Sequence, residues 1–134
     1  MDIKKRLYRY SDLKFEKAQL EEKIEDIKEQ LTSIHSQSFD NVCSFSGGSD
    51  KTGNLIATLS DLQTLYITKC NELTKELIAI EQLISCLEPN ERILIRKRYI
   101  ECEKWEDVCV EMNYSWRGIH KLHSKILIKL EESA

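Results

Sequence analysis

The sequence predicts an all-α protein, and two observations carry the prediction. Apolar residues recur at alternating spacings of three and four through two long stretches, residues 2–34 and 54–87, which is the period of helices that pack along one face. The chain also has only one proline and four glycines among 134 residues, with 32% of its residues charged. Such a composition is typical of long, solvated helices. We therefore expect a long antiparallel helical hairpin, coiled-coil-like, followed by a small three-helix unit.

The first stretch predicts one helix from residue 2 to residue 34. Its apolar residues lie on a single seam, which Arg6 and Lys17 interrupt. The charged side chains between them are interpreted as a solvated face. The seam consists of Ile3, Tyr10, Leu13, Leu20, Ile24, Ile27, Leu31 and Ile34.

Residues 35–53 lose this periodicity and gather Ser, Gly, Asp and Asn, which predicts a flexible linker. A fragment of it is superficially similar to a phosphate-binding loop. However, Asp50 stands before Lys51 where such a loop needs glycine, and a helix rather than a strand is expected ahead of it. We therefore interpret the segment as the turn of the hairpin, with Asp50 or Thr52 capping the next helix.

The second stretch predicts a helix from residue 54 to residue 87, with Gln63 as the one polar position of its seam. Its length is similar to that of the first helix, which favours an antiparallel hairpin. Further apolar residues lie off the seam, so the stripe is wider than two helices need. This favours either a homodimer through residues 1–88 or packing against the C-terminal unit. The seam is Ile56, Leu59, Tyr66, Cys70, Leu73, Leu77, Ile80, Ile84 and Leu87, and the additional residues are Leu55, Leu62, Leu65, Ile67 and Leu83.

Pro89 predicts a boundary, because proline disfavours helical geometry at the residue before it and suits the first turn of a new helix. We place a hairpin domain at residues 1–88 and a second domain at residues 89–134. The next helix, residues 90–100, is expected to bury Ile93, Leu94 and Tyr99.

Two short helices joined by a tight turn follow, beginning near Trp105. Asn113 stands at the reversal and tolerates positive φ better than most residues, and Ser115 is a good N-cap for the second helix. This spacing is typical of a helix-turn-helix. The apolar faces that close on each other are Val108, Cys109 and Met112 on the first helix and Ile119 and Leu122 on the second.

Several of these residues also carry a resemblance to a known family: Tyr99, Trp105, Val108, Met112, Tyr114, Ser115, Leu122 and His123. Together with residues 87–92 and 96–100, they resemble region 4 of the sigma-70 class of transcription factors. The pattern is most similar to short prophage proteins of Gram-positive bacteria that are described as ArpU-like late-gene regulators. The resemblance is strongest over residues 87–130, and the loop 47–54 also resembles one in that family.

The chain departs from the family pattern at four positions. Cys102 and Asn113 stand where glycine is usual, and Cys109 stands where alanine is usual. Lys104 stands where a serine N-cap is usual, and the lost cap costs ~1 kcal/mol.

The second helix of the motif carries the candidate DNA-binding side chains. In helix-turn-helix proteins this strip enters the major groove. Arg117 is the best candidate for a base contact, since its guanidinium can bind guanine O6 and N7 together. Trp116 could instead pack against Tyr114 or Tyr99, and His123 is expected in the core. The candidates are Ser115, Trp116, Arg117, His120, Lys121, Ser124 and Lys125, with further phosphate contacts from Arg96, Lys97 and Arg98.

Charge distribution agrees with a nucleic-acid face in the C-terminal third. Residues 90–130 carry nine Lys/Arg against six Asp/Glu, whereas residues 1–89 carry eleven against fifteen.

Other chemistry is not expected. The five cysteines have no CxxC spacing and are expected to be reduced thiols, and a zinc site from His35 and Cys43 would lack two further ligands. We predict no metal, no cofactor and no catalytic set, hence no enzyme. No apolar run reaches about 18 residues, so we expect a cytoplasmic protein without a membrane partner.

The leading hypothesis is a sequence-specific, duplex DNA-binding transcription regulator of phage or prophage type. The resemblance implies RNA polymerase as a second partner. Two alternatives stay open: a small terminase-like DNA-packaging subunit, and an interaction adaptor that has lost DNA binding.

Overall fold

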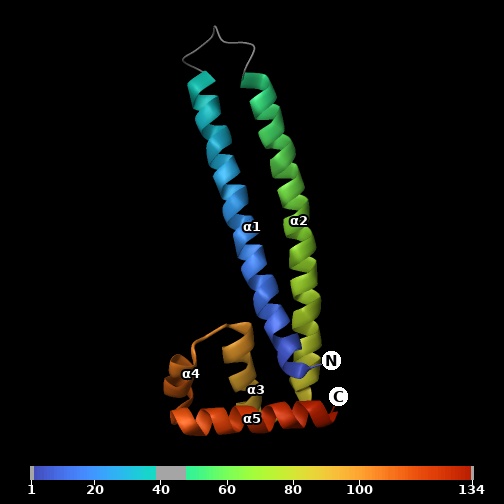
Figure 1. Cartoon of the computed structure of the whole chain (residues 1–134), viewed down its shortest axis with the longest axis vertical. Coiled ribbons are helices and arrows are strands. Elements are labelled where there is room, and N and C mark those ends of the chain that lie inside the picture. Colours follow the sequence, from blue (N-terminus) through green and yellow to red (C-terminus); the bar gives the residue numbers. More distant parts are fainter. Residues whose placement is uncertain (1, 39–47, 134) are drawn as a thin grey trace. The chain divides into compact units, whose positions relative to one another are not determined.

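The computed structural model describes the backbone of residues 2–38 and 48–133, and the side chains of residues 2–34 and 50–133. Within these ranges every regular element is helical, and the predicted all-α fold class is confirmed. Figure 1 shows the elements, which are α1 (Ile3–Ser38), α2 (Gly48–Leu83), η1 (Ile84–Cys86), α3 (Pro89–Ile95), η2 (Arg96–Ile100), α4 (Trp105–Met112) and α5 (Trp116–Ser133). They group into two compact units: unit 1 is Met1–Lys14 with Glu72–Ala134, and unit 2 is Phe15–Asn71.

The two long helices extend into the predicted linker, residues 35–53, from both sides. Helix α1 continues to Ser38, and α2 begins at Gly48. Serine and glycine are weak helix formers, but near a helix end they cost little. Asp50 lies inside the first turn of α2, where its carboxylate is favoured by the helix dipole. Residues 39–47 and the side chains of His35 and Cys43 lie outside the described residues.

In unit 2, α1 and α2 run antiparallel (Figure 1). Glu16 forms an ion pair with Lys69 at 2.8 Å, and the Tyr66 hydroxyl donates to Glu21 at 2.8 Å. The residue number rises on α1 as it falls on α2, which is the signature of an antiparallel pair. Ile24 is buried between them.

The predicted seam on α2 was wrong at two positions. Ile56 is 55% exposed and Gln63 is exposed, whereas Leu55 and Leu62 are half-buried. Both sets fit a three–four alternation, so periodicity alone does not separate them.

Unit 1 contains the main hydrophobic core. Arg6 pairs with Glu76 at 3.6 Å, so α1 and α2 are antiparallel here as well. Leu7 is fully buried, which continues the seam across the break predicted at Arg6. The helices after Pro89 share this core with the first residues of α1 and the last residues of α2. The compact unit is therefore larger than the predicted domain 89–134. The core residues are Ile3, Leu7, Tyr10, Ile80, Ile84, Leu87, Leu94, Ile95, Tyr99, Val108, Ile119, Ile126 and Leu130.

The predicted burial of Leu94 and Tyr99 is confirmed, and that of Ile93 is wrong. Ile93 is 43% exposed, while Leu94 and Ile95 are fully buried. The helix then widens into the π-helical turn η2, in which the Glu101 N–H donates to the Arg96 carbonyl at 2.8 Å.

Candidate nucleic-acid interface

The turn between α4 and α5 is built from local interactions. Asn113 adopts the left-handed conformation, with φ 59° and ψ 41°, and ends α4. The following N–H, of Tyr114, donates to the Cys109 carbonyl at 3.0 Å. Ser115 Oγ accepts the Gly118 N–H at 3.0 Å, as an N-cap does. The predicted structural roles of Asn113 and Ser115 are thus confirmed.

Gly118 supports this cap and was not singled out from the sequence. A Cβ atom at this position would lie 3.0 Å from Ser115 Oγ and 3.6 Å from the Tyr114 ring. Glycine therefore lets the capping hydroxyl approach the first turn of α5 without strain.

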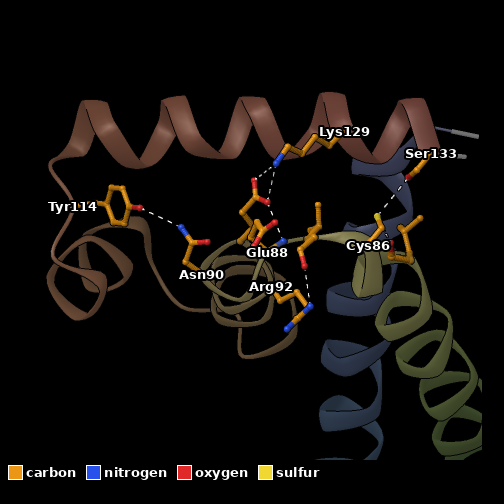
Figure 2. A network of polar contacts seen from close by, with 10 residues as sticks. Cys86, Glu88, Asn90, Arg92, Tyr114, Lys129 and Ser133 are labelled. Atoms are coloured by element: carbon orange, nitrogen blue, oxygen red, sulfur yellow. Dashed lines mark hydrogen bonds and ion pairs between the residues drawn. The ribbon is translucent and has the colours of Figure 1, made fainter.

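A polar network fixes α5 against the start of α3 (Figure 2). Glu91 is 2% exposed, and its carboxylate accepts from Lys129 Nζ at 2.9 and 3.0 Å and from the Glu88 N–H at 3.1 Å. Burial acts to raise the pKa of Glu91, but these hydrogen bonds and the Lys129 charge outweigh it and hold the pKa below the ordinary value. The Lys129–Glu91 pair thereby holds α5 to α3, while the Glu88 N–H fixes the Glu91 carboxylate at the start of α3.

Two weaker contacts in Figure 2 add to this attachment. Asn90 donates to the Tyr114 hydroxyl at 3.5 Å, next to the turn of the motif. Near the other end of α5, the Cys86 thiol donates to Ser133 Oγ at 3.8 Å. Helix α5 is thus attached near both ends, which fixes the direction in which its outer face points.

The outer face of α5 carries exposed, mostly basic residues. Arg117 and Lys121 are exposed, and among the residues that the structure describes none forms a hydrogen bond or ion pair with either of them. Lys125 is exposed, and its charge acts on Glu91. The Ser124 hydroxyl donates to the His120 carbonyl at 3.0 Å. Arg117 and Lys121 are therefore the cations most available to a ligand.

The rings of Trp116 and His120 are in edge-on contact at the start of α5. Trp116 is 54% exposed and meets the His120 ring edge-on at 4.5 Å between centroids. Within the described residues it makes no ring contact with Tyr114 or Tyr99. On its other side His120 lies 4.6 Å from the Trp105 ring. The Nε2 atom of His120 is buried without a hydrogen-bond partner among the described residues. This nitrogen is therefore not accessible to a DNA base placed against the outer face of α5.

His123 lies on the inner face of α5, as predicted. It is 8% exposed, packs 4.8 Å from the Trp105 ring, and shares a hydrogen bond with Tyr99. Burial, with smaller contributions from the charges of Lys4, His120 and Arg98, lowers its pKa to about 4. The imidazole is thus a neutral core group at pH 7.

The three predicted phosphate contacts already have internal partners. Arg96 donates twice to the Glu81 carboxylate, at 3.0 and 2.7 Å, and the bond from Arg96 is the main cause that lowers the pKa of Glu81. Lys97 pairs with Glu111 at 2.6 Å. Arg98 donates to the Glu103 carbonyl at 2.8 Å, and its guanidinium lies 4.9 Å from the centre of the Trp105 ring. A DNA phosphate would have to compete with these contacts.

Unit 1 also contains a basic segment that was not among the predicted DNA-binding residues. Residues 1–14 carry five Lys/Arg and two Asp/Glu, and Lys4, Lys5 and Arg9 are exposed. Lys4 lies near enough to α5 for its charge to lower the pKa of His123. The cluster is visible in the sequence, but its place in the unit that holds the helix-turn-helix follows only from the tertiary contacts.

Comparison of the chain with protein-family models, curated proteins and solved structures finds no match. Within the described ranges, no three His, Cys, Asp or Glu side chains gather in a group able to hold a metal ion. Nor is any helix of those ranges both long and apolar enough to cross a membrane.

Proposed function

We propose that this chain binds duplex DNA sequence-specifically as a transcription regulator of phage or prophage type. The observation that carries the proposal is the pair of exposed cations Arg117 and Lys121, which have no partner within the described residues and follow directly after the turn of the motif. A helix-turn-helix presents this part of its second helix to the major groove.

Each side chain of the outer face has a role in the proposal. Arg117 binds a guanine through O6 and N7, because its planar guanidinium matches those two acceptors. Lys121 and Lys125 contact phosphates, which fixes the register of α5 on the duplex. Trp116 is exposed beside Arg117 and offers an apolar surface to a thymine methyl group.

The resemblance to sigma-70 region 4 extends the proposal to a second partner, RNA polymerase. Both partners belong to the cytoplasm of a bacterial cell, and the proposal places the protein there. A homodimer through the hairpin helices would let two copies of α5 read two half-sites on the same duplex.

The test is binding of the purified protein to DNA fragments from around its own gene, measured by fluorescence anisotropy across a salt series. Arg117→Ala/Lys121→Ala should weaken binding by at least about ten-fold and reduce the slope of log affinity against log salt by about 1–2. Lys23→Ala/Lys51→Ala is the matched control, since it removes two exposed positive charges from unit 2. The control should bind as the wild type does.

Equal and weak binding of wild type and Arg117→Ala/Lys121→Ala to every fragment would rule out the proposal. The interaction adaptor would then take its place, and the internal pairing of Arg96, Lys97 and Arg98 favours that second function. Retention of purified RNA polymerase by the chain would then be measured directly.

A further inference from the structure

A series of ring contacts joins η2 to the exposed indole at the start of α5. The Arg98 guanidinium lies 4.9 Å from the centre of the Trp105 ring. The Trp105 ring lies 4.6 Å from that of His120, and the His120 ring lies 4.5 Å from that of Trp116. All four residues belong to unit 1. Because Trp105 packs against the core of this unit, the series connects a surface indole to the core.

The inner end of this series is held by contacts from two elements. In η2, the guanidinium of Arg98 lies over the Trp105 ring and donates to the Glu103 carbonyl at 2.8 Å. In α5, the His123 ring meets Trp105 edge-on at 4.8 Å, and His123 is 8% exposed. Cation–π and aromatic contacts depend on geometry, so they favour one orientation of the indole. Trp105 therefore provides a fixed surface for His120.

His120 takes part in the series through its ring. Its Nε2 atom is buried and has no hydrogen-bond partner among the residues that the structure describes. A buried polar atom without a partner destabilises a fold. The side chain therefore contributes its two ring contacts, with Trp105 and Trp116, and not a hydrogen bond from this nitrogen. An aromatic ring without the nitrogen should make the same contacts.

The outer end of the series lies where a helix-turn-helix reads DNA. Trp116 is the first residue of α5 and is 54% exposed. It stands four residues before His120, the spacing at which side chains of one helix meet. The N-terminal residues of the second helix of the motif lie nearest the bases, and the apolar group that base pairs present in the major groove is the thymine methyl. An indole held at this position therefore matches a thymine.

We propose that His120 is a positioning residue for DNA specificity: supported by Trp105, it holds the Trp116 indole against the methyl group of one thymine in the DNA site. His120 itself contacts no base, although it was among the predicted DNA-binding residues. This inference rests on the proposed DNA binding, and it adds the residues that fix the indole in place. An indole that is ordered before DNA arrives loses less conformational freedom on binding.

The first test needs no DNA. In the isotope-labelled full chain, the NMR order parameter of the Trp116 indole N–H should be close to the roughly 0.85 of a rigid backbone, and in His120→Ala it should fall below about 0.6. His120→Phe keeps a ring and should retain the wild-type value. His120→Gln keeps a polar side chain without a ring and should behave as alanine does. Lys121→Ala, on the outer face of the same helix, is the control and should leave the indole unchanged.

The second test uses a DNA fragment that the protein binds. Replacing single thymines by deoxyuridine removes one methyl group at a time, and at one position this should weaken binding of the wild type by about 3- to 10-fold. His120→Ala should bind the thymine and deoxyuridine fragments equally, whereas His120→Phe should keep the difference. The slope of log affinity against log salt should be the same in all three proteins, since neither substitution removes a phosphate contact.

Four results would overturn the proposal: a wild type that binds thymine and deoxyuridine alike at every position, an equally ordered Trp116 indole in His120→Ala, an undiminished preference for thymine in His120→Ala, or loss of that preference in His120→Phe. Circular dichroism of each variant separates these results from unfolding. Failure of the regulator role is distinguishable, because a wild type that binds no fragment can still show an indole that His120 orders. In that case His120 positions Trp116, and the thymine contact is excluded.

Discussion

The Tyr99 hydroxyl lies 2.6 Å from Nε2 of His123, and both side chains are buried. Their rings lie 5.7 Å apart with an interplanar angle of 24°. The pair joins η2 to the inner face of α5 through a hydrogen bond that the neutral imidazole can accept. Burial raises the pKa of Tyr99 and lowers that of His123, so both groups stay uncharged at pH 7.

The first prediction concerns stability in acid. The folded-state pKa of His123, about 4, lies below its ordinary value of 6.5, so the imidazole contributes stability above pH 6.5 that is lost as the pH falls to 4. One proton gives a slope that approaches about 1.4 kcal/mol per pH unit in this window. Between pH 6.5 and pH 4, the free energy of unfolding measured with urea should fall less per pH unit for Tyr99→Phe/His123→Phe than for the wild type. Equal slopes for the two proteins would contradict it.

The second prediction concerns stability that is lost as the pH rises. Hydrogen bonding to Glu111, then desolvation, raises the pKa of Glu103 from 4.5 to about 7. The contribution of this carboxyl to stability is therefore present below pH 4.5 and is lost as the pH rises to 7. Glu103→Gln keeps a donor for Glu111 without a charge, so it should raise the melting temperature more at pH 8 than at pH 5. Glu131→Gln, an exposed carboxylate on α5, serves as the control and should show no such difference.

The third prediction restores a missing helix cap. Lys104 occupies the N-cap position of α4 with φ −69° and ψ 149°, and its side chain makes no capping hydrogen bond. Lys104→Ser supplies an acceptor for the first-turn N–H groups and should raise the free energy of unfolding by about 1 kcal/mol. Lys104→Ala removes the same side chain without adding an acceptor. If alanine stabilises as much as serine does, capping is not the cause.

The fourth prediction concerns backbone strain at Cys102. This residue has a φ of 58°, a conformation that costs a side chain with a Cβ about 1–2 kcal/mol. Cys102→Gly removes that cost, but glycine also raises the conformational entropy of the unfolded chain, which offsets part of the gain. The free energy of unfolding should therefore rise by about 0.5–1 kcal/mol. Chemical denaturation of Cys102→Ala provides the comparison, since alanine retains the strain. A gain in both variants would assign the effect to the thiol.

Features that depend on neighbours in the sequence were predictable here. The left-handed Asn113 and the capping Ser115 follow from local chemistry, and both are observed. The period of the apolar residues likewise predicted two long helices. The period did not show whether Leu55 or Ile56 is buried, because this depends on where the neighbouring helix packs.

Features that depend on distant residues were not predictable from the pattern. Arg96, Lys97 and Arg98 read as a basic run, yet their partners Glu81, Glu111 and the Glu103 carbonyl come from elsewhere in the fold. In the same way, the position of His120 between two indoles depends on Trp105, fifteen residues earlier in the chain.

The π turn η2 affects how this chain must be compared with any other. A turn closed from residue 101 to residue 96 holds one residue more than an α-helical turn, so side chains within the turn are offset by up to about 100° from where an α-helix would place them. A homologue with a regular helix here would carry one residue fewer. Its alignment to this chain then needs a gap of one position between Arg96 and Glu101. Without that gap, Lys97 and Arg98 would be equated with side chains that point in other directions.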